Sequence, residues 1–268
     1  MADPKADTGP FSGTFDDENP WWAALFPDFH AIAADDLPPG VASGSEWTSV
    51  CINPPLYLAW LVGQCRAAGV VLRRARLQHI SEAAALHDGP AAAADLVVNC
   101  TGLLASRLGG VADASVVPAR GQTVLVRNAL EPMIAFDDGR VEGEVCYAMC
   151  RASGGGTVLG GTFQLGNWDA APDPRVAERI MARVVAVHPQ LRGQGVEVLD
   201  VVRHQVGLRP YRKGGVRVER EKIEGRWVVH NYGHGGWGYQ GSYGCAERVV
   251  ELVEEIVAEM DAVAEKSG

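Results

Sequence analysis

The sequence lacks the features that would point toward membranes, zinc or nucleic acids. No apolar run approaches the roughly 18 residues that a membrane-spanning helix needs. The opening segment MADPKADTGPFSGTF has no apolar signal core. The six cysteines include no C-x-x-C pair, so a structural zinc site is not indicated. Lys and Arg (24) are outnumbered by Asp and Glu (33), which argues against binding to a phosphate backbone. We therefore expect a soluble, non-secreted protein with no metal, no nucleic-acid partner and no membrane.

Apolar residues make up 47% of the 268 residues, which is enough to build the core of one large domain or of two closely joined ones. Residues 1–19 are rich in Asp, Gly and Pro, and we expect this lead to be disordered. The remainder mixes short apolar runs bounded by glycine with longer periodic segments. This mixture predicts an α/β or α+β fold.

Three helices are predicted from capping residues and apolar spacing. Asn53-Pro54 opens the first, whose apolar face is Leu58, Leu61, Val62 and Cys65. Asp173-Pro174 opens the second, with Val176, Ile180, Val184 and Val187 on one face, and the third covers 242–264. Strands are predicted at 70–72, 95–99, 122–126, 157–159, 216–219 and 227–230.

A glycine-rich turn lies between the last predicted strand and the last helix. Gly233, Gly235 and Gly238 satisfy G-x-G-x-x-G, and such glycines let backbone N–H groups approach an electron-rich ligand. A dinucleotide fingerprint, however, belongs to a βαβ unit with an acidic residue about 20 positions further on. Here one long helix follows, so a plain glycine-rich turn and a ligand loop both stay open.

Six linked motifs resemble the D-amino-acid oxidase and D-aspartate oxidase family, and the fungal-type D-amino-acid oxidases in particular. In chain order they are LVVNCTG (96–102), RGQTV (120–124), LGGTFQLGNW (159–168), VGLRPYRKGGVRVER (206–220), HNYGHGGWGYQ (230–240) and SYGCA (242–246). The resemblance covers roughly residues 20–260. It implies an enzyme that oxidatively deaminates D-amino acids with FAD and O₂, giving a 2-oxo acid, ammonia and H₂O₂.

The resemblance also implies a fold in which an FAD-binding, Rossmann-like domain is interleaved with a substrate domain on a large mixed β-sheet. The substrate domain would take residues 20–48 and 116–212, and a partial FAD-binding domain would take 49–115 and 213–268. Full-length members open with a strand, a G-x-G-x-x-G turn and a helix, all upstream of the matched region. We therefore expect an N-terminally truncated member that keeps its substrate chemistry and has lost much of its affinity for FAD.

Residue roles follow from the matched positions. The substrate carboxylate would meet the fork-shaped Arg209 guanidinium and the Tyr147 hydroxyl, and the substrate amine would meet the Gly236 carbonyl and Gln240. Residues bordering the cofactor would be Thr101, Gly102, Leu103, Leu77, Gly235, Gly236, Gly238, Tyr239 and Gln240. No side chain is assigned as a general base, because family chemistry is hydride transfer, which demands orientation.

Several alternatives stay open beside this interpretation. One is a non-catalytic remnant or a mis-started gene model of the family, and another is a D-aspartate oxidase. Many members carry a Ser-Lys-Leu-like peroxisomal tail, whereas this chain ends Glu265-Lys-Ser-Gly268. The location is therefore predicted as peroxisome, by resemblance, or cytoplasm. A homodimer is one assembly state left open.

Overall fold

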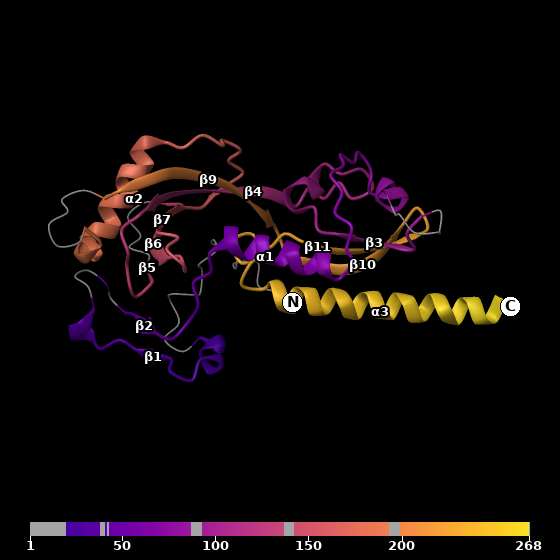
Figure 1. The fold of residues 1–268 in the computed structure, drawn as a ribbon, viewed down its shortest axis with the longest axis horizontal. Coiled ribbons are helices and arrows are strands. Elements are labelled where there is room, and N and C mark those ends of the chain that lie inside the picture. The colour runs from indigo at the N-terminus through magenta and orange to yellow at the C-terminus, as the bar shows by residue number, and fades with distance from the viewer. Residues whose placement is uncertain are drawn as a thin grey trace. The chain divides into compact units, whose positions relative to one another are not determined.

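The computed structural model describes residues 20–37, 41, 43–86, 93–136, 142–192 and 199–267. The predicted disordered lead, 1–19, lies outside them. The chain divides into two compact units, each assembled from three stretches (Figure 1). Unit 1 is residues 1–73, 120–164 and 169–207, and unit 2 is residues 74–119, 165–168 and 208–268. The mixture of helices and strands confirms the α/β class.

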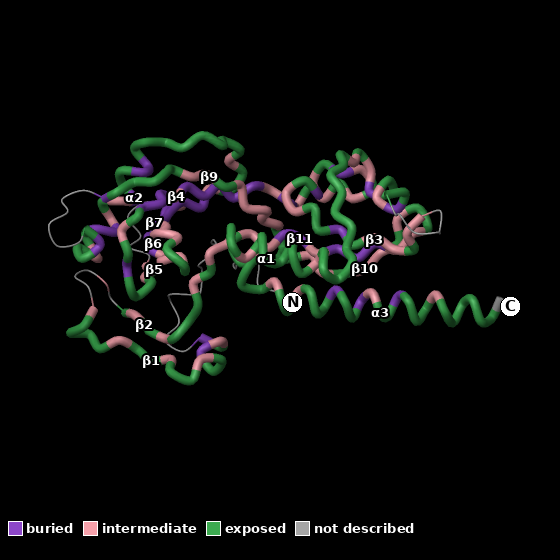
Figure 2. Tube along the Cα trace, viewed as in Figure 1, coloured by how far each residue is buried: buried purple, intermediate pink, exposed green. Residues whose placement is uncertain are grey.

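Unit 1 is built on an extended sheet with the order β5-β6-β7-β4-β8, in which β9 also pairs with β4. The neighbours β5–β6, β6–β7 and β7–β4 are antiparallel. The strands are β4 (Val116–Val126), β5 (Ile134–Phe136), β6 (Glu144–Cys150), β7 (Thr157–Thr162), β8 (Gln164–Leu165) and β9 (Val201–Arg212). Residues 116–119 of β4 and 208–212 of β9 are assigned to unit 2. Figure 2 shows that buried residues concentrate along β4.

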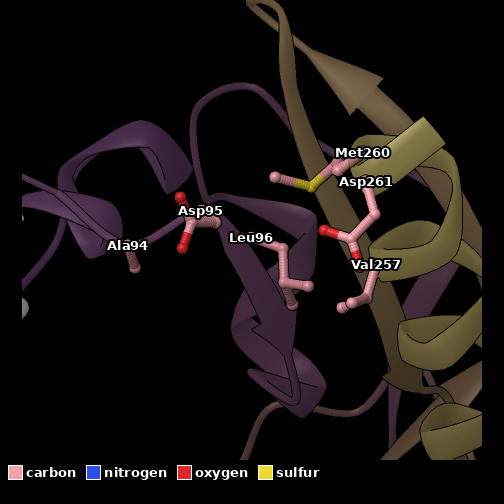
Figure 3. Close-up of a pocket in the computed structure, with 6 residues that line it drawn as sticks. All are labelled: Ala94, Asp95, Leu96, Val257, Met260 and Asp261. Carbon is pink, nitrogen blue, oxygen red and sulfur yellow. The ribbon is translucent and has the colours of Figure 1, made fainter. Parts of the chain in front are cut away.

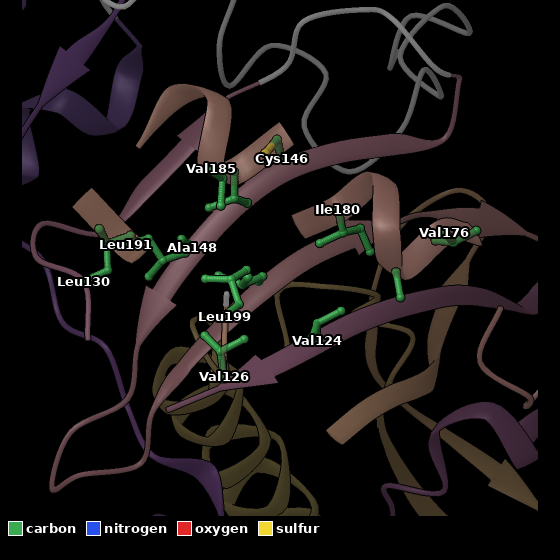
Figure 4. Packing of buried hydrophobic residues seen from close by; sticks show 13 residues of the cluster. Val124, Val126, Leu130, Cys146, Ala148, Val176, Ile180, Val185, Leu191 and Leu199 are labelled. Carbon is green, nitrogen blue, oxygen red and sulfur yellow. The ribbon is translucent and has the colours of Figure 1, made fainter. Parts of the chain in front are cut away.

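Helix α2 (Pro174–Val187) covers this sheet, as its sequence predicts. Asp173 caps it by accepting from the Arg175 backbone N–H at 2.8 Å. Val176, Ile180 and Val184 are buried on one face, in the cluster shown in Figure 4. The short η5 helix (Pro189–Arg192) follows and adds the buried Leu191 to the same cluster. The apolar spacing in the sequence therefore identifies the main core of unit 1.

The N-terminal part of unit 1 is made of short elements around a small aromatic cluster. They are η1 (Trp21–Leu25), β1 (His30–Ala31), η2 (Ala34–Asp36) and β2 (Ser45–Glu46), with β1 and β2 antiparallel. The ring of Trp22 lies 4.9 Å from Trp47 and 5.5 Å from Phe29, centroid to centroid. Edge and tilted ring contacts of this kind are favourable, and they give this segment a local core.

Helix α1 (Pro54–Ala67) forms where the Asn53-Pro54 signal predicts it and stops before Gly69, whose φ is +84°. No residue of α1 is buried, so the apolar residues that predict the helix do not form a core with other described residues. The run 70–72 was also predicted as a strand but forms none. Apolar periodicity shows that a helix is amphipathic, but it does not show what the apolar face packs against. A strand forms only where a neighbouring strand accepts its hydrogen bonds. The described residues provide no such neighbour for 70–72.

Unit 2 contains a three-stranded sheet with the order β10-β11-β3. Strand β3 (Leu96–Asn99) runs parallel to β11 (Arg226–Tyr232), and β10 (Arg217–Ile223) is antiparallel to β11. The long helix α3 (Ser242–Ser267) packs one face through Val249, Leu252 and Ile256 against Val229. The other face is covered from η3 (Ile80–Leu86) and from Leu108, just beyond η4 (Gly102–Ser106).

Charged pairs also join α3 to the sheet. Arg220 on β10 lies 2.6 Å from Glu259 and 3.5 Å from Glu255, both on α3. No helix in the described part of the chain combines the length and the apolarity that crossing a membrane requires.

Candidate functional site

Three segments of unit 2 that are distant in sequence meet at one place. They are the turn at 101–103, the end of β9 at 209–211 and the loop at 233–236. The Gly235 N–H donates to the Pro210 carbonyl at 2.8 Å, and Tyr211 forms an antiparallel bridge with His234. A Cβ added to Gly102 would meet the Pro210 ring at 3.7 Å. The G-L-R-P motif therefore lies in contact with both glycine turns.

The parallel pairing of β3 and β11 explains why these turns meet. His230 is in register with Asn99, so the two strands deliver their following turns to the same edge of the sheet. Ligands of open α/β sheets bind outside the carboxyl ends of the strands. Gly102 (φ +58°) and Gly235 (φ +56°) adopt the left-handed conformation that glycine tolerates without strain. The glycines at this edge are thus required by the backbone.

Arg209, the predicted carboxylate-binding residue, is half-buried and lies against the second glycine turn. A Cβ placed on Gly236 would meet only the Cδ of Arg209, at 4.0 Å. Gly236 is itself exposed, so the backbone here can be approached closely by a ligand. The structure therefore brings Arg209 and Gly236 together, and their contacts to the substrate carboxylate and amine stay predictions.

The remaining predicted residues of this loop lead directly into α3. Tyr239 and Gln240 are exposed, in a turn where the Tyr239 carbonyl accepts from the Ser242 hydroxyl at 2.8 Å. Gly238 is half-buried, and an added Cβ would meet His234 at 3.6 Å. The amino end of α3, the positive end of the helix dipole, follows at once. This loop can present flat apolar surface and a positive helix end to a ligand.

Two predicted cofactor residues contribute to the core of unit 2. Leu103 packs against the cluster of Ala105, Val116 and Tyr232. Leu77 packs against a different cluster, which includes Ile80. The predicted role of Leu77 at the adenine half of a cofactor stays a prediction, because its contacts in the structure are those of a core residue.

Tyr147 belongs to unit 1, where it lies on β6 in register with Gly160 of β7. Its side chain is 8% exposed. A Cβ on Gly160 would overlap the Cζ and Oη of the Tyr147 ring, and one on Gly161 would lie 3.0 Å from that Oη. The Tyr147 ring therefore packs directly on the backbone of Gly160 and Gly161, where no side chain could fit. We call this contact the seat of Tyr147, and the sequence did not predict it.

A polar network behind the turn at Thr101 was also missed. Asn99 Oδ1 accepts from the Thr101 backbone N–H at 3.1 Å and from its hydroxyl at 2.7 Å. Further along, Tyr232 donates from its hydroxyl to Asp113 at 2.9 Å, and Arg212 donates to the same carboxylate at 2.8 Å. Asn two residues before Thr is a recognised local turn pattern, and this signal could have identified Asn99.

The electrostatics of the network follow from these contacts. Burial acts to raise the pKa of Asp113, but the hydrogen bonds from Arg212, the Ser115 N–H and Tyr232 outweigh it and hold the pKa at about 2. At the candidate site itself, burial lowers the pKa of His234 and favours an uncharged ring there. Asp113 therefore stays a carboxylate that anchors the strand ends.

A separate cavity of ≈320 Å³ lies at the other end of β3 (Figure 3). Its lining includes Leu96 at the start of β3 and Val257 and Met260 of α3. Because the turn at Thr101 follows the opposite end of β3, the cavity is distinct from the three-segment site. Among the described residues, no group of three or more His, Cys, Asp or Glu side chains is arranged to hold a metal ion.

Comparison with known proteins identifies the family of the chain. A family model described as FAD dependent oxidoreductase matches residues 16–252. A D-amino-acid oxidase from Fusarium vanettenii is 50% identical over 258 residues, which cover 94% of this chain and 70% of that protein. The chain belongs to the D-amino-acid oxidase family. The predicted family resemblance is thereby confirmed, and with it membership of the FAD-dependent oxidoreductases.

Two further similarities define the breadth of the match. A D-aspartate oxidase from Talaromyces thermophilus is 34% identical over 234 residues, covering 87% of this chain and 60% of that protein. Glycine oxidase from Geobacillus kaustophilus is 22% identical with a TM-score of 0.65, covering 87% of this chain and 65% of that one; at this identity the likeness shows the fold alone. The chain thus spans about 60% to 70% of the length of these curated oxidases.

The residues at the three-segment site fit a flavin. The backbone at Gly236 is open to close approach, and Leu104, Trp237 and Tyr239 expose apolar surface near the turns. A flat ring system needs such surface together with backbone N–H and C=O groups at its polar edge.

Proposed function

We propose that this chain provides the substrate-binding part and the flavin-ring surface of a D-amino-acid oxidase. The observation that carries the proposal is the convergence of Arg209, the Gly102 turn and Gly236 at the carboxyl ends of β3 and β11. The overall reaction converts a D-amino acid, O₂ and water into a 2-oxo acid, ammonia and H₂O₂. FAD, when bound, supplies the electron-accepting chemistry.

The protein's own residues bind and orient the substrate. The Arg209 guanidinium binds the carboxylate with two parallel N–H···O bonds. Family resemblance alone assigns a further hydrogen bond to the Tyr147 hydroxyl. The Gly236 carbonyl accepts from the substrate amine, and Gln240 lies four residues further along the same loop. Because its carboxylate and its amine are both bound, the substrate presents its Cα in one orientation. The reaction depends on this positioning.

Thr101, Gly102, Leu103, Gly235, Gly238 and Tyr239 would hold the flavin in this proposal. Leu77 is assigned to the adenine half. The amino end of α3, beginning at Ser242, would favour negative charge on a bound ligand near it. Support for these roles comes from the motifs and from the left-handed glycines at 102 and 235.

The substrate class is tested by assaying H₂O₂ release from D-Ala, D-Val and D-Asp with the full chain and added FAD. We expect neutral D-amino acids to be oxidised in preference to D-Asp, since identity is higher to the D-amino-acid oxidase (50%) than to the D-aspartate oxidase (34%). A preference for D-Asp would favour the D-aspartate oxidase alternative. A chain that neither retains flavin nor releases H₂O₂ would favour the non-catalytic alternative.

The carboxylate assignment has its own test. Arg209→Ala should raise KM for D-Ala by about 100-fold, because a charge-assisted, two-pronged contact is removed. The exposed Arg203, six residues earlier on β9, provides the control, and Arg203→Ala should leave KM unchanged. If Arg209→Ala left activity on all three substrates untouched, the assignment would be wrong.

Location and assembly belong to the same proposal. Family resemblance supports a peroxisomal location, with the cytoplasm as the alternative. Imaging of a fluorescent fusion against a peroxisomal marker distinguishes the two. Light scattering of the purified chain decides between a monomer and a homodimer.

A further inference from the structure

A continuous hydrogen-bond chain in unit 2 connects the turn at Thr101 with strand β10. Asn99 holds Thr101 through its Oδ1, as described above. On the other side of the same amide, Asn99 Nδ2 lies 3.0 Å from His230 Nδ1, and His230 Nε2 lies 2.8 Å from Glu221 Oε1. Asn99 is 1% exposed and His230 is 0% exposed. Water therefore cannot substitute for a missing partner without rearrangement.

The direction of each hydrogen bond in this chain follows from one fixed donor. The Thr101 backbone N–H can only donate, so the Asn99 atom that faces it is the oxygen, and the Asn99 NH₂ faces His230. His230 Nδ1 must then accept and carry no proton. The proton of the neutral ring is on Nε2, which donates to Glu221. Thr101 thus selects a single tautomer of His230.

The surroundings of His230 keep this ring uncharged. Arg217, Glu219 and Glu221 face it from β10, and Tyr232 lies edge-on from its own strand with ring centroids 5.6 Å apart. Burial lowers the pKa of His230, and the charge of Arg217 lowers it further, against the opposing effect of the two glutamates. A protonated Nδ1 would point its N–H at the Asn99 NH₂, and the amide could then no longer hold Thr101.

We propose that His230 is a positioning residue that fixes the orientation of the Asn99 amide and thereby holds the Thr101–Gly102 turn in place. The proposal rests on the proposed function in one respect, namely that this turn faces the flavin. His230 lies behind the turn and is separated from it by Asn99, so its role is to hold backbone rather than to move a substrate proton. A histidine with one accepting and one donating nitrogen serves both neighbours at once.

The central test compares two variants of similar shape in the full chain without added flavin. Asn in His230→Asn offers an amide oxygen near the position of Nδ1, whereas Leu in His230→Leu has nearly the same volume and no acceptor. Hydrogen exchange of the Thr101 amide should be about tenfold faster in His230→Leu, as expected for a lost buried hydrogen bond, and within about twofold of wild type in His230→Asn. Equal exchange in all three proteins would overturn the proposal.

A second measurement needs no change at position 230. NMR of the ¹⁵N-histidine-labelled chain should show that His230 is protonated on Nε2 and unprotonated on Nδ1. A proton on Nδ1 would overturn the assignment. In Asn99→Asp the carboxylate still accepts from Thr101 but demands a proton from Nδ1. The titration of His230 should therefore move to higher pH, and an unmoved titration would also count against the proposal.

Binding of FAD separates this inference from the proposed function. The dissociation constant for FAD should rise by about tenfold in His230→Leu and much less in His230→Asn, since a mobile turn must be ordered on binding. If exchange at Thr101 responds as expected while no protein binds FAD, the positioning role is supported and the proposed function fails. If FAD binds and exchange does not respond, the proposed function stands and the positioning role fails.

Discussion

The seat of Tyr147 yields a prediction whose size can be worked from the structure. Gly160→Ala places a methyl group on β7 where the Cζ and Oη of the Tyr147 ring already lie. Tyr147 is 8% exposed, and its ring has little room to withdraw. Overpacking of this kind costs about 1–3 kcal/mol, partly offset by the roughly 0.5–1 kcal/mol that Ala gains over Gly in a strand. We expect a net loss of about 1–2 kcal/mol in the free energy of unfolding.

Urea unfolding of the full chain, followed by tryptophan fluorescence, measures this loss. The same substitution in a Tyr147→Ala background should cost nothing or stabilise slightly, because the obstructing ring is gone. The coupling between the two sites should therefore be about 2 kcal/mol. Gly63→Ala in α1 is the matched control, since nothing lies within 4 Å of the added methyl group; it should stabilise by about 0.5–1 kcal/mol.

The reasoning is refuted if Gly160→Ala costs as much without the Tyr147 ring as with it. In that case the methyl group would collide with something other than the tyrosine. Activity gives a second criterion under the proposed function. Displacing the hydroxyl should raise KM for D-Ala by about tenfold and leave kcat less affected, as expected for a lost substrate contact.

Three further outcomes follow from buried polar contacts. Glu144→Gln should destabilise by about 2 kcal/mol in urea unfolding, because the carboxylate is 3% exposed and neutralises Arg183, which is itself 11% exposed. Arg120→Met should cost about 3 kcal/mol by the same assay, since the buried Arg120 guanidinium loses its bonds to the Asp169 and Ala171 carbonyls and leaves the buried Gln122 oxygen without this donor; a neutral result would contradict the hydrogen-bond assignment. The pKa of Asp113 is depressed to about 2, so its stabilising effect is complete above pH about 4 and is lost as the pH falls through about 2. Asp113→Asn should therefore flatten the acid limb of the stability profile over that range, and an unchanged limb would refute the assignment.

Much of the fold could be predicted from local signals. Asp173 as cap and the spacing of Val176, Ile180 and Val184 identify α2 and its buried face, because both depend only on neighbours along the helix. The prediction of a strand at 70–72 is wrong because a strand depends on more than its local sequence. Its apolar composition is typical of a strand, but pairing depends on residues elsewhere in the chain.

The candidate site shows the same limit. Motif resemblance located Arg209 and the glycine turns, and the structure shows that these lie together in unit 2. The seat of Tyr147 could not be foreseen, because it depends on the register between β6 and β7, which no local pattern specifies. The same holds for the link between Asn99 and His230, which are 131 residues apart in sequence.

That separation has a consequence for how the protein is made. Strand β3 is synthesised long before β11, the strand that pairs with it in parallel. At about 5–20 residues per second, the ribosome needs on the order of ten seconds to make the intervening chain. During that interval the backbone N–H and C=O groups of the apolar strand β3 lack the partner strand β11. The rate of translation through the middle of the message therefore sets how long the growing chain is exposed to aggregation.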